Sequence, residues 1–285
     1  MAFAPSTGVS QTHALTKHHT ISVVVPCSRR YRCHDRRTSM RATKGGEEHV
    51  TPNHRGNIVL AKNGASAGRQ QLTIAVDVDE VLGRFVHSLN AFCEETYSCQ
   101  YHVKDYFVYD FARVWQCSQD ESNRRVHEFF DSVHFRDGIE VIPGSYDSLV
   151  RLKERISGIK LNVVTSRQHV IQDHTMEWLE HHFPDTFDAV YFGNHFALEG
   201  VSKKKSEICS EIGASVLIDD NPVYAMECAQ AGIKVLLYDW ELEYPWSKTN
   251  EGPIHDNIVR VSSWLEVEEQ IYDMSLSLQT CTTKA

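Results

Sequence analysis

Apolar residues in this chain gather in short runs, which are separated by longer segments with apolar positions at helical spacing. Short runs rich in Val, Ile and Leu are typical of strands buried on both faces, and their alternation with helices is typical of a parallel α/β sheet. The predicted strands cover residues 72–76, 159–164, 187–192, 214–218, 234–238 and 257–261.

Helix signals fill the segments between these strands. Asn221-Pro222 offers a cap residue and a proline at the first helical position, and Gly232 ends the helix that follows. Other helices are expected over 85–92 and 170–183, in the lysine-bearing segment up to Ile212, and from Ser263 onward. The fold class predicted is a doubly wound, mostly parallel α/β sheet, with the strand at 72–76 in its centre and the strands at 159–164 and 214–218 beside it.

The first predicted strand runs directly into two acidic residues, Asp77 and Asp79. Charge at the carboxyl end of a parallel strand lies at the sheet edge where open α/β folds bind their ligands. Taken alone, such a pair is more often a solvated loop or a helix cap than a catalytic centre. Its meaning therefore depends on the residues that follow the other strands.

Polar residues also follow two later strands. The second strand ends in Thr165-Ser166, which presents hydroxyls and backbone N–H groups at the start of a helix. The fourth strand ends in Asp219-Asp220, and the basic cluster Lys203-Lys204-Lys205 precedes it. Three strands thus end in side chains of complementary chemistry.

These groups together supply what phosphoryl transfer needs: a carboxylate nucleophile, a second carboxyl to carry a proton, hydroxyls to hold oxygens and a lysine to offset charge. Several carboxylates in one cleft repel one another unless a cation or protons compensate them. Mg2+ prefers oxygen ligands and is usually held by one or two carboxylates together with waters. Asp77, a carbonyl oxygen of Asp79, and Asp219 would suit this ion.

The motifs Asp77-Val78-Asp79, Thr165-Ser166, Lys205 and Asp219-Asp220, in this order, resemble the four motifs of the haloacid dehalogenase (HAD) superfamily of aspartate-dependent phosphatases. Receiver domains of two-component signalling use similar residues, but there the lysine comes last, whereas here it precedes the acidic pair. Dehalogenases proper lack the second aspartate of the first motif, so Asp79 points to phosphate esters. The resemblance implies a Rossmann-like core with the HAD fold.

Within that superfamily the chain resembles the 5′-nucleotidase C branch, which includes the deoxyribonucleotidases. The resemblance rests on Ile142-Pro143-Gly144-Ser145, on 205–209, on 216–222 and on 229–239, and it covers roughly residues 72–246. Glu80 stands where that branch usually has glycine, and Asp-x-Asp-Glu resembles instead the capless protein phosphatases of the superfamily. A small phosphate ester is the implied substrate, with phosphoproteins as the alternative.

An inserted unit is expected between the first two motifs, because the 86 positions from Asp79 to Thr165 exceed what one crossover helix needs. Ser118 and Glu121 have the spacing of a capping box, and apolar residues follow at helical spacing. In the resemblance this unit is a small helical cap that restricts substrates to small molecules. Its aromatic residues either stack a flat substrate or form the core of the cap, and the core is favoured because small units need large side chains. They are Tyr101, Tyr106, Phe107, Tyr109, Phe111 and Trp115.

The mechanism that the resemblance implies is a double displacement. Asp77 attacks phosphorus, and Asp79 first protonates the leaving oxygen and then takes a proton from the attacking water. Thr165 and Ser166 hold phosphoryl oxygens, and Lys205 offsets their charge. The implied Mg2+ site consists of Asp77, Asp79, Asp219 and Asp220, with one residue of the last pair as ligand and the other acting through water or Lys205.

The expected activity is Mg2+-dependent hydrolysis of a small phosphorylated substrate such as a nucleoside 5′-monophosphate. Two alternatives stay open: a non-catalytic module of this fold that binds a phosphorylated ligand or a protein, and an enzyme with phosphotransferase or phosphoprotein phosphatase activity. Two residues also have alternative roles. Lys204 replaces Lys205 if the register shifts by one position, and Glu80 either caps the next helix or faces outward.

Charge divides the chain into two parts. Residues 1–70 hold 11 Lys and Arg against 3 Asp and Glu, whereas the rest holds 18 against 35. Low acidity with many Ser and Arg residues is typical of an organelle transit peptide, and the almost uncharged opening favours the plastid. We therefore expect a disordered leader that directs the protein to the chloroplast, with the mitochondrion or the cytoplasm as alternatives. A basic tail that stays attached or binds nucleic acid is the other interpretation.

The predicted organisation is a leader at 1–70, a core at 71–84 and 141–275, a cap at 85–140 and a flexible tail at 276–285. With 41% hydrophobic and 24% charged residues, the chain can bury one core. No apolar run has the length of a membrane span, and the acidic body argues against a nucleic-acid polymer as partner. The sequence leaves the oligomeric state open. The eight cysteines contain no Cys-x-x-Cys pair and are expected to be free thiols, with Cys209 and Cys228 as packing residues.

Overall fold

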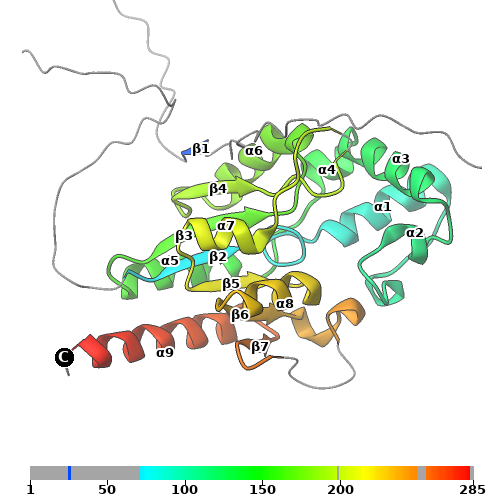
Figure 1. Cartoon of the computed structure of the whole chain (residues 1–285). Helices are drawn as coiled ribbons and strands as arrows, with labels where there is room; N and C mark the ends of the chain where they lie inside the picture. The colour runs from blue at the N-terminus through cyan, green and yellow to red at the C-terminus, as the bar shows by residue number, and fades with distance from the viewer. Residues whose placement is uncertain (1–24, 27–70, 198, 249–254, 283–285) are drawn as a thin grey trace, which may run out of the picture.

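A seven-stranded sheet with the strand order β1-β4-β3-β2-β5-β6-β7 lies at the centre of the protein (Figure 1). The computed structural model describes residues 25–26, 71–197, 199–248 and 255–282. Strands β2 to β7 are parallel, and β1 pairs antiparallel with β4 at the edge. The strands are β1 Val25–Pro26, β2 Thr73–Val76, β3 Lys160–Thr165, β4 Ala189–Phe192, β5 Val216–Asp219, β6 Lys234–Tyr238 and β7 Ile258–Val261.

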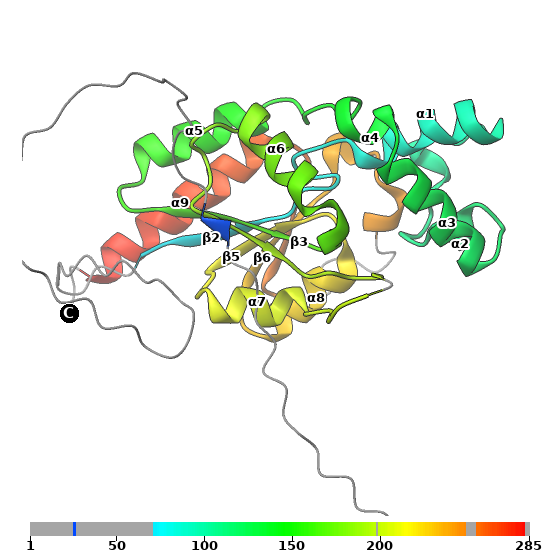
Figure 2. The same ribbon diagram turned by 90° about the horizontal axis from the view of Figure 1, so that it is seen from above.

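Helices cover both faces of this sheet, as a doubly wound fold requires (Figure 2). Helices α5, α6 and α9 lie on one face, and α7 and α8 lie on the other. The helices are α1 Phe85–Tyr97, α2 Phe111–Val114, α3 Gln119–Phe130, α4 Val133–Asp137, α5 Ser145–Arg155, α6 Gln172–His182, α7 Lys205–Glu211, α8 Pro222–Gln230 and α9 Trp264–Thr282, and short 3-10 helices are η1 Val103–Asp105, η2 His169–Ile171, η3 Trp240–Leu242 and η4 Pro245–Ser247.

Alternation along β2 divides the core between the two faces. Ile74 and Val76 pack into the cluster with α5 and α9, whereas Ala75 points to the other side and packs with α7 and α8. All four β2 residues are buried, which explains why the run contains so little polarity. Asp77 is the first charged position after this run, and it therefore lies where the buried strand meets the edge of the sheet.

The prediction of a central first-motif strand is confirmed. Val76 of β2 is in register with Val163 of β3 on one side and with Ile218 of β5 on the other. Because these strands are parallel, the residues that follow each of them meet at one edge of the sheet. Asp77, Thr165 and Asp219 are brought together in this way.

Helices α1 to α4 form a group at one end of the molecule, where the cap was expected (Figures 1 and 2). Aromatic side chains form much of their packing, for example Phe85 against Phe129, with ring centroids 5.2 Å apart in an edge-on arrangement. Only one of the two hydrogen bonds of the predicted capping box forms. Ser118 Oγ accepts a hydrogen bond from the Glu121 backbone N–H, but the Glu121 side chain binds Arg124 and Arg125 instead of returning to the cap.

The structure differs from the predicted organisation at two places. Val25–Pro26, expected in the leader, pair with β4; the rest of the leader, and with it the transit-peptide prediction, lies outside the described residues. The predicted boundary between core and tail falls inside α9, which continues to Thr282. Its apolar face does not stop at residue 275, because Ile271, Met274 and Leu278 all pack against the core.

Free thiols are found at Cys93, Cys99, Cys117, Cys209 and Cys228, and the last two are buried packing residues as predicted. His169, His174 and His181 are exposed, and His182 is half-buried. None of the helices in the described ranges is long and apolar enough to cross a membrane.

Candidate active site

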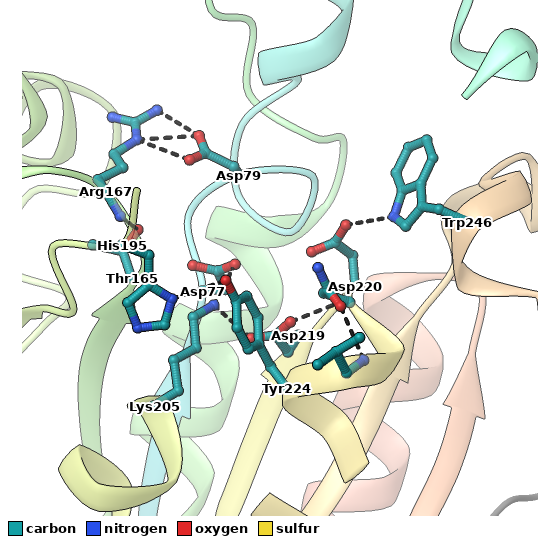
Figure 3. Close-up of polar contacts among 12 residues, drawn as sticks. Asp77, Asp79, Thr165, Arg167, His195, Lys205, Asp219, Asp220, Tyr224 and Trp246 are labelled. Atoms are coloured by element: carbon teal, nitrogen blue, oxygen red, sulfur yellow. Dashed lines mark hydrogen bonds and ion pairs between the residues drawn. The ribbon is translucent and has the colours of Figure 1, made fainter. Parts of the chain in front are cut away.

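Lys205 joins two carboxylates at the centre of the sheet edge (Figure 3). Its Nζ lies 2.7 Å from Asp77 Oδ2 and 2.6 Å from Asp219 Oδ2. Each residue is held by the end of an element: Asp77 follows β2, Asp219 ends β5, and Lys205 begins α7. The lysine side chain has no exposed surface. A buried cation between two carboxylates compensates charge that would otherwise repel.

Burial dominates the electrostatics of this group. It raises the pKa of Asp77 to about 7, against the opposing effect of the Lys205 charge. Burial alone would lower the pKa of Lys205, but the carboxylates of Asp219 and Asp77 raise it above its ordinary value. Lys205 is therefore a permanent positive charge, and Asp77 is a carboxylate whose charge depends on the cations around it.

Asp220 is the second residue of the Asp219-Asp220 pair. Its side chain is hydrogen-bonded to an aromatic residue that lies 26 positions further along the chain. Trp246 Nε1–H donates to Asp220 Oδ2 at 2.7 Å. Burial, followed by the nearby charge of Asp219, raises the pKa of Asp220 well above its ordinary value. The indole hydrogen bond fixes the direction of a carboxylate that has little contact with solvent.

Asp77, Asp219 and Asp220 have carboxylate oxygens within 4.8 Å of one another. Asp77 Oδ1 is buried and has no hydrogen-bond partner among the described residues. Both oxygens of Asp219 are engaged, one by Lys205 and the other by the Asn221 backbone N–H. A hard cation such as Mg2+ fits this oxygen donor set, and Asp77 and Asp220 are the carboxylates that remain to bind it directly.

Asp79 is held apart from this acidic group by Arg167. The guanidinium contacts Asp79 Oδ1 at 2.7 Å from Nη2 and at 3.1 Å from Nε, and it contacts Oδ2 at 3.2 Å from Nε. In Figure 3 the pair lies to one side of the Asp77 carboxylate. The side chain of Asp79 thus lines the cavity apart from the acidic group.

Thr165 and Ser166 differ in their positions. Thr165 is fully buried, and its hydroxyl accepts a hydrogen bond from the Arg167 backbone N–H at 3.2 Å. Ser166 lines the cavity. The hydroxyl pair predicted from sequence is therefore split between Thr165, which stabilises the turn, and Ser166, which lines the cavity.

A cavity of about 350 Å³ lies above the acidic group. Asp77, Asp79, Asp220 and Ser166 line it, and helix α3 supplies Gln119, Ser122, Asn123, Val126 and His127 from the cap side. The aromatic residues of the cap differ in their positions. Tyr106 and Trp115 are buried in the cap, whereas Tyr109 and Phe111 line the cavity.

His195 and Tyr224 extend the wall of the site and were not predicted from sequence. The Tyr224 hydroxyl lies 2.8 Å from His195 Nδ1, and His195 Nε2 lies 2.7 Å from the Lys203 carbonyl oxygen. Because a carbonyl only accepts, Nε2 carries the proton of the neutral ring and Nδ1 accepts from Tyr224. The Tyr224 ring also covers Lys205, with Nζ 4.7 Å from the ring centroid.

Glu80 caps the helix after the site, which decides between its two predicted roles. Its Oε1 accepts a hydrogen bond from the Val86 backbone N–H at 2.6 Å, and burial raises its pKa to about 7. The residue has a φ of 59°, in the left-handed region that favours glycine. The hydrogen bond to α1 offsets the strain of a side chain at this position.

Lys205 is the lysine of the basic cluster that reaches the carboxylates, so the one-position shift to Lys204 does not occur. Lys204 is exposed and pairs with Glu227 at 3.3 Å. Lys203 pairs with Glu211 on the surface of α7.

A family model supports the same assignment. Residues 70–277 match the model of the 5′ nucleotidase, deoxy (Pyrimidine), cytosolic type C protein family. The chain belongs to this family. It is a HAD-like hydrolase of the phosphatase class, as the order of the four motifs predicted.

Three individual relatives are 13% to 26% identical to this chain. The chain is 26% identical over 203 residues to the "Putative nucleotidase YqfW" of Bacillus subtilis, an alignment that covers 68% of this chain and 91% of the relative. Among solved structures, a "predicted phosphatase" from Clostridium acetobutylicum has a TM-score of 0.53 at 15% identity, over 71% of this chain and 99% of its own. A haloacid dehalogenase-like family hydrolase from Streptococcus pneumoniae has a TM-score of 0.50 at 13% identity, over 70% and 98%. At these identities the structures show the shared fold.

Proposed function

We propose that this protein is a Mg2+-dependent phosphomonoester hydrolase that acts through an aspartyl-phosphate on a small phosphorylated metabolite such as a nucleoside 5′-monophosphate. The observation that carries the proposal is the buried bridge from Asp77, which lines the cavity, through Lys205 to Asp219. A carboxylate with a free, buried oxygen beside a fixed positive charge is arranged as a nucleophile toward a phosphoryl group.

In the first step, an oxygen of Asp77 forms a bond to phosphorus while the bond from phosphorus to the ester oxygen breaks. The leaving oxygen takes the proton of the Asp79 carboxyl and departs as an alcohol. Lys205 offsets the charge of the phosphoryl oxygens, and Ser166 lies at the cavity wall where its hydroxyl can donate to one of them. Thr165 supports the turn that positions Ser166 and is the second hydroxyl proposed for this task.

In the second step, a water molecule attacks phosphorus and gives a proton to the Asp79 carboxylate. The bond from phosphorus to Asp77 breaks, and phosphate leaves with Asp77 restored as a carboxylate. The residues proposed to hold Mg2+ are Asp77 and Asp220 through their carboxylates and Asp79 through its backbone carbonyl, with Asp219 acting through Lys205. When bound, the ion neutralises charge on the transferred phosphoryl group.

The cavity favours a small substrate with a flat or polar part. Its volume of about 350 Å³ lies at the lower end of typical small-molecule sites. Tyr109 and Phe111 offer aromatic faces, and Gln119 and Asn123 offer amides one helical turn apart on α3. A nucleoside 5′-monophosphate has both an aromatic ring and polar edges, whereas a phosphoprotein would have to enter under the cap helices.

A panel of phosphometabolites tests the proposal. We expect the protein with Mg2+ to release phosphate from one or more small esters, and Asp77→Asn to lose this activity by at least roughly 10³-fold, because an amide does not replace the nucleophile. Asp173→Asn, an exposed aspartate in the first turn of α6 that does not line the cavity, is the matched control. Full activity of Asp77→Asn would refute the nucleophile, and an inactive parent on the whole panel would favour the ligand-binding alternative.

We also propose that residues 1–70 direct the protein to the chloroplast, since their composition is that of a transit peptide. Fluorescent fusions of this segment and of the remaining chain, compared in plant cells, test the idea. Import of the segment into plastids supports it, and a cytoplasmic or mitochondrial signal refutes it.

A further inference from the structure

Arg167 is a closely held charged side chain among the residues that line the cavity. Its Nη1 donates to Thr175 Oγ1 at 3.1 Å, and its guanidinium lies over the Phe135 ring of α4 at 5.4 Å from the centroid. Its backbone is fixed as well, by Thr165 Oγ1 on the N–H and by the Asn194 N–H on the carbonyl. Only 2% of the side chain is exposed. These contacts hold the guanidinium against Asp79.

The two oxygens of Asp79 are held unequally by this guanidinium. Oδ1 accepts two hydrogen bonds, from Nη2 at 2.7 Å and from Nε at 3.1 Å, whereas Oδ2 accepts one shared bond from Nε at 3.2 Å. A carboxyl group that gains a proton keeps the acceptor capacity of its other oxygen. Oδ2 is therefore the oxygen that can carry a proton without loss of the strongest contact to Arg167.

The position of this pair also has an electrostatic reason. Asp77, Asp219 and Asp220 already bring three carboxylates within 4.8 Å of one another, and a bound cation there would attract a fourth. Asp79 lines the same cavity and is two positions from Asp77. The contacts from Arg167 oppose that attraction and keep the Asp79 carboxylate out of the acidic group.

We propose that Arg167 is a positioning residue that holds Asp79 by Oδ1 at the cavity wall and leaves Oδ2 to carry the proton to and from the ester oxygen. This role rests on the proposed phosphatase function. It also connects the cap to the acid, because Phe135 of α4 packs on the guanidinium that orients Asp79.

A comparison of leaving groups tests the role. An alkyl ester needs a proton on its departing oxygen, whereas para-nitrophenyl phosphate releases a stabilised phenolate. In Arg167→Met we expect kcat/KM for an alkyl phosphate to fall about 10- to 100-fold, and for the aryl ester to fall less than about threefold. Arg167→Lys keeps the charge but loses the two-point contact, so we expect the same pattern with a smaller loss.

A double variant shows whether Arg167 acts through Asp79. If it does, adding Arg167→Met to Asp79→Asn leaves kcat/KM for the alkyl ester unchanged within about twofold, because the group that Arg167 orients is already gone. Arg151→Met is the matched control: Arg151 makes a similar two-point contact with Glu268 between α5 and α9, remote from the cavity residues. It should leave both esters unaffected.

Equal losses on both esters, a change confined to KM, or additive losses in the double variant would each overturn the assignment of Arg167. Those results leave the proposed function standing, because the parent protein still hydrolyses the esters. A parent protein inactive on both esters overturns the proposed function and this role together.

Discussion

Lys205 and Asp219 form an ion pair whose Nζ and Oδ2 are 2.6 Å apart, and neither side chain has exposed surface. The same Nζ reaches Asp77 at 2.7 Å. One buried positive charge therefore ties the residue after β2 to the residue that ends β5, and the two strands it connects are neighbours in the sheet.

Removal of this charge should cost both stability and activity. In Lys205→Met, Asp77 and Asp219 stay buried without their cation, and breaking a buried ion pair from one side typically costs about 3–5 kcal/mol. We expect a loss of that size in urea denaturation with a chelator present, together with loss of phosphate release. Lys204→Met, which removes an exposed neighbour paired with Glu227, should change neither. A Lys205→Met protein as stable as the parent would contradict the role of the bridge.

The indole of Trp246 should control cation affinity. Trp246→Phe removes the hydrogen bond to Asp220 Oδ2 and keeps an aromatic ring against Tyr244, which it stacks at 4.6 Å between centroids. Loss of a hydrogen bond to a metal ligand typically weakens binding about 10- to 100-fold. Calorimetric titration with Mg2+ should show a weakening in this range. Trp178→Phe, which loses an indole bond to the Ile139 carbonyl, should bind Mg2+ as the parent does; equal affinity in both variants would show that Trp246 does not orient a ligand.

The sequence predicts the parts of this site that follow strands. The pattern of residues alone places Asp77, Thr165 and Asp219 together, because parallel strands end at a common edge and each run of apolar residues marks a strand. Lys205 could be assigned through the order of the motifs. The apolar runs determined the positions at the strand ends, and the structure agrees with them.

Contacts made by loops could not be predicted in the same way. Arg167 lies 88 positions from Asp79, and Trp246 lies 26 positions from Asp220. No periodicity connects residues whose positions depend on the paths of turns and on packing at the cap. Arg167 does follow Thr165-Ser166 directly, and a charged residue so close to a motif is the one local signal that could have identified it. The continuation of α9 beyond residue 275 was visible in the spacing of Ile271, Met274 and Leu278, which is helical.

The stability of helix α3, which lines the cavity, should depend on its N-cap residue, Ser118. Ser118→Ala removes the acceptor for the Glu121 N–H and should destabilise the protein by about 1 kcal/mol. Thermal unfolding followed by circular dichroism measures this change. Ser210→Ala, an exposed serine bonded within α7 to the Ser206 carbonyl, is the control and should have a much smaller effect. An unchanged midpoint of thermal unfolding in Ser118→Ala would mean that neighbouring contacts, not the Ser118 side chain, determine where α3 begins.

Acid stability should depend on Glu268, which joins α9 to α5. Hydrogen bonding from Arg151 lowers the pKa of Glu268 below its ordinary 4.5, against the opposing effect of burial. The unfolded chain thus binds this proton at a higher pH than the folded protein does, so the stabilisation is complete above about 4.5 and is lost as pH falls through the folded pKa. In Glu268→Gln we expect about 1–2 kcal/mol less stability at pH 7 and a difference from the parent that shrinks below pH 4.5. Urea denaturation across this range measures the effect, with the exposed neighbour change Glu269→Gln as control. A constant difference at all pH values would show that the contribution of Glu268 is packing, not charge.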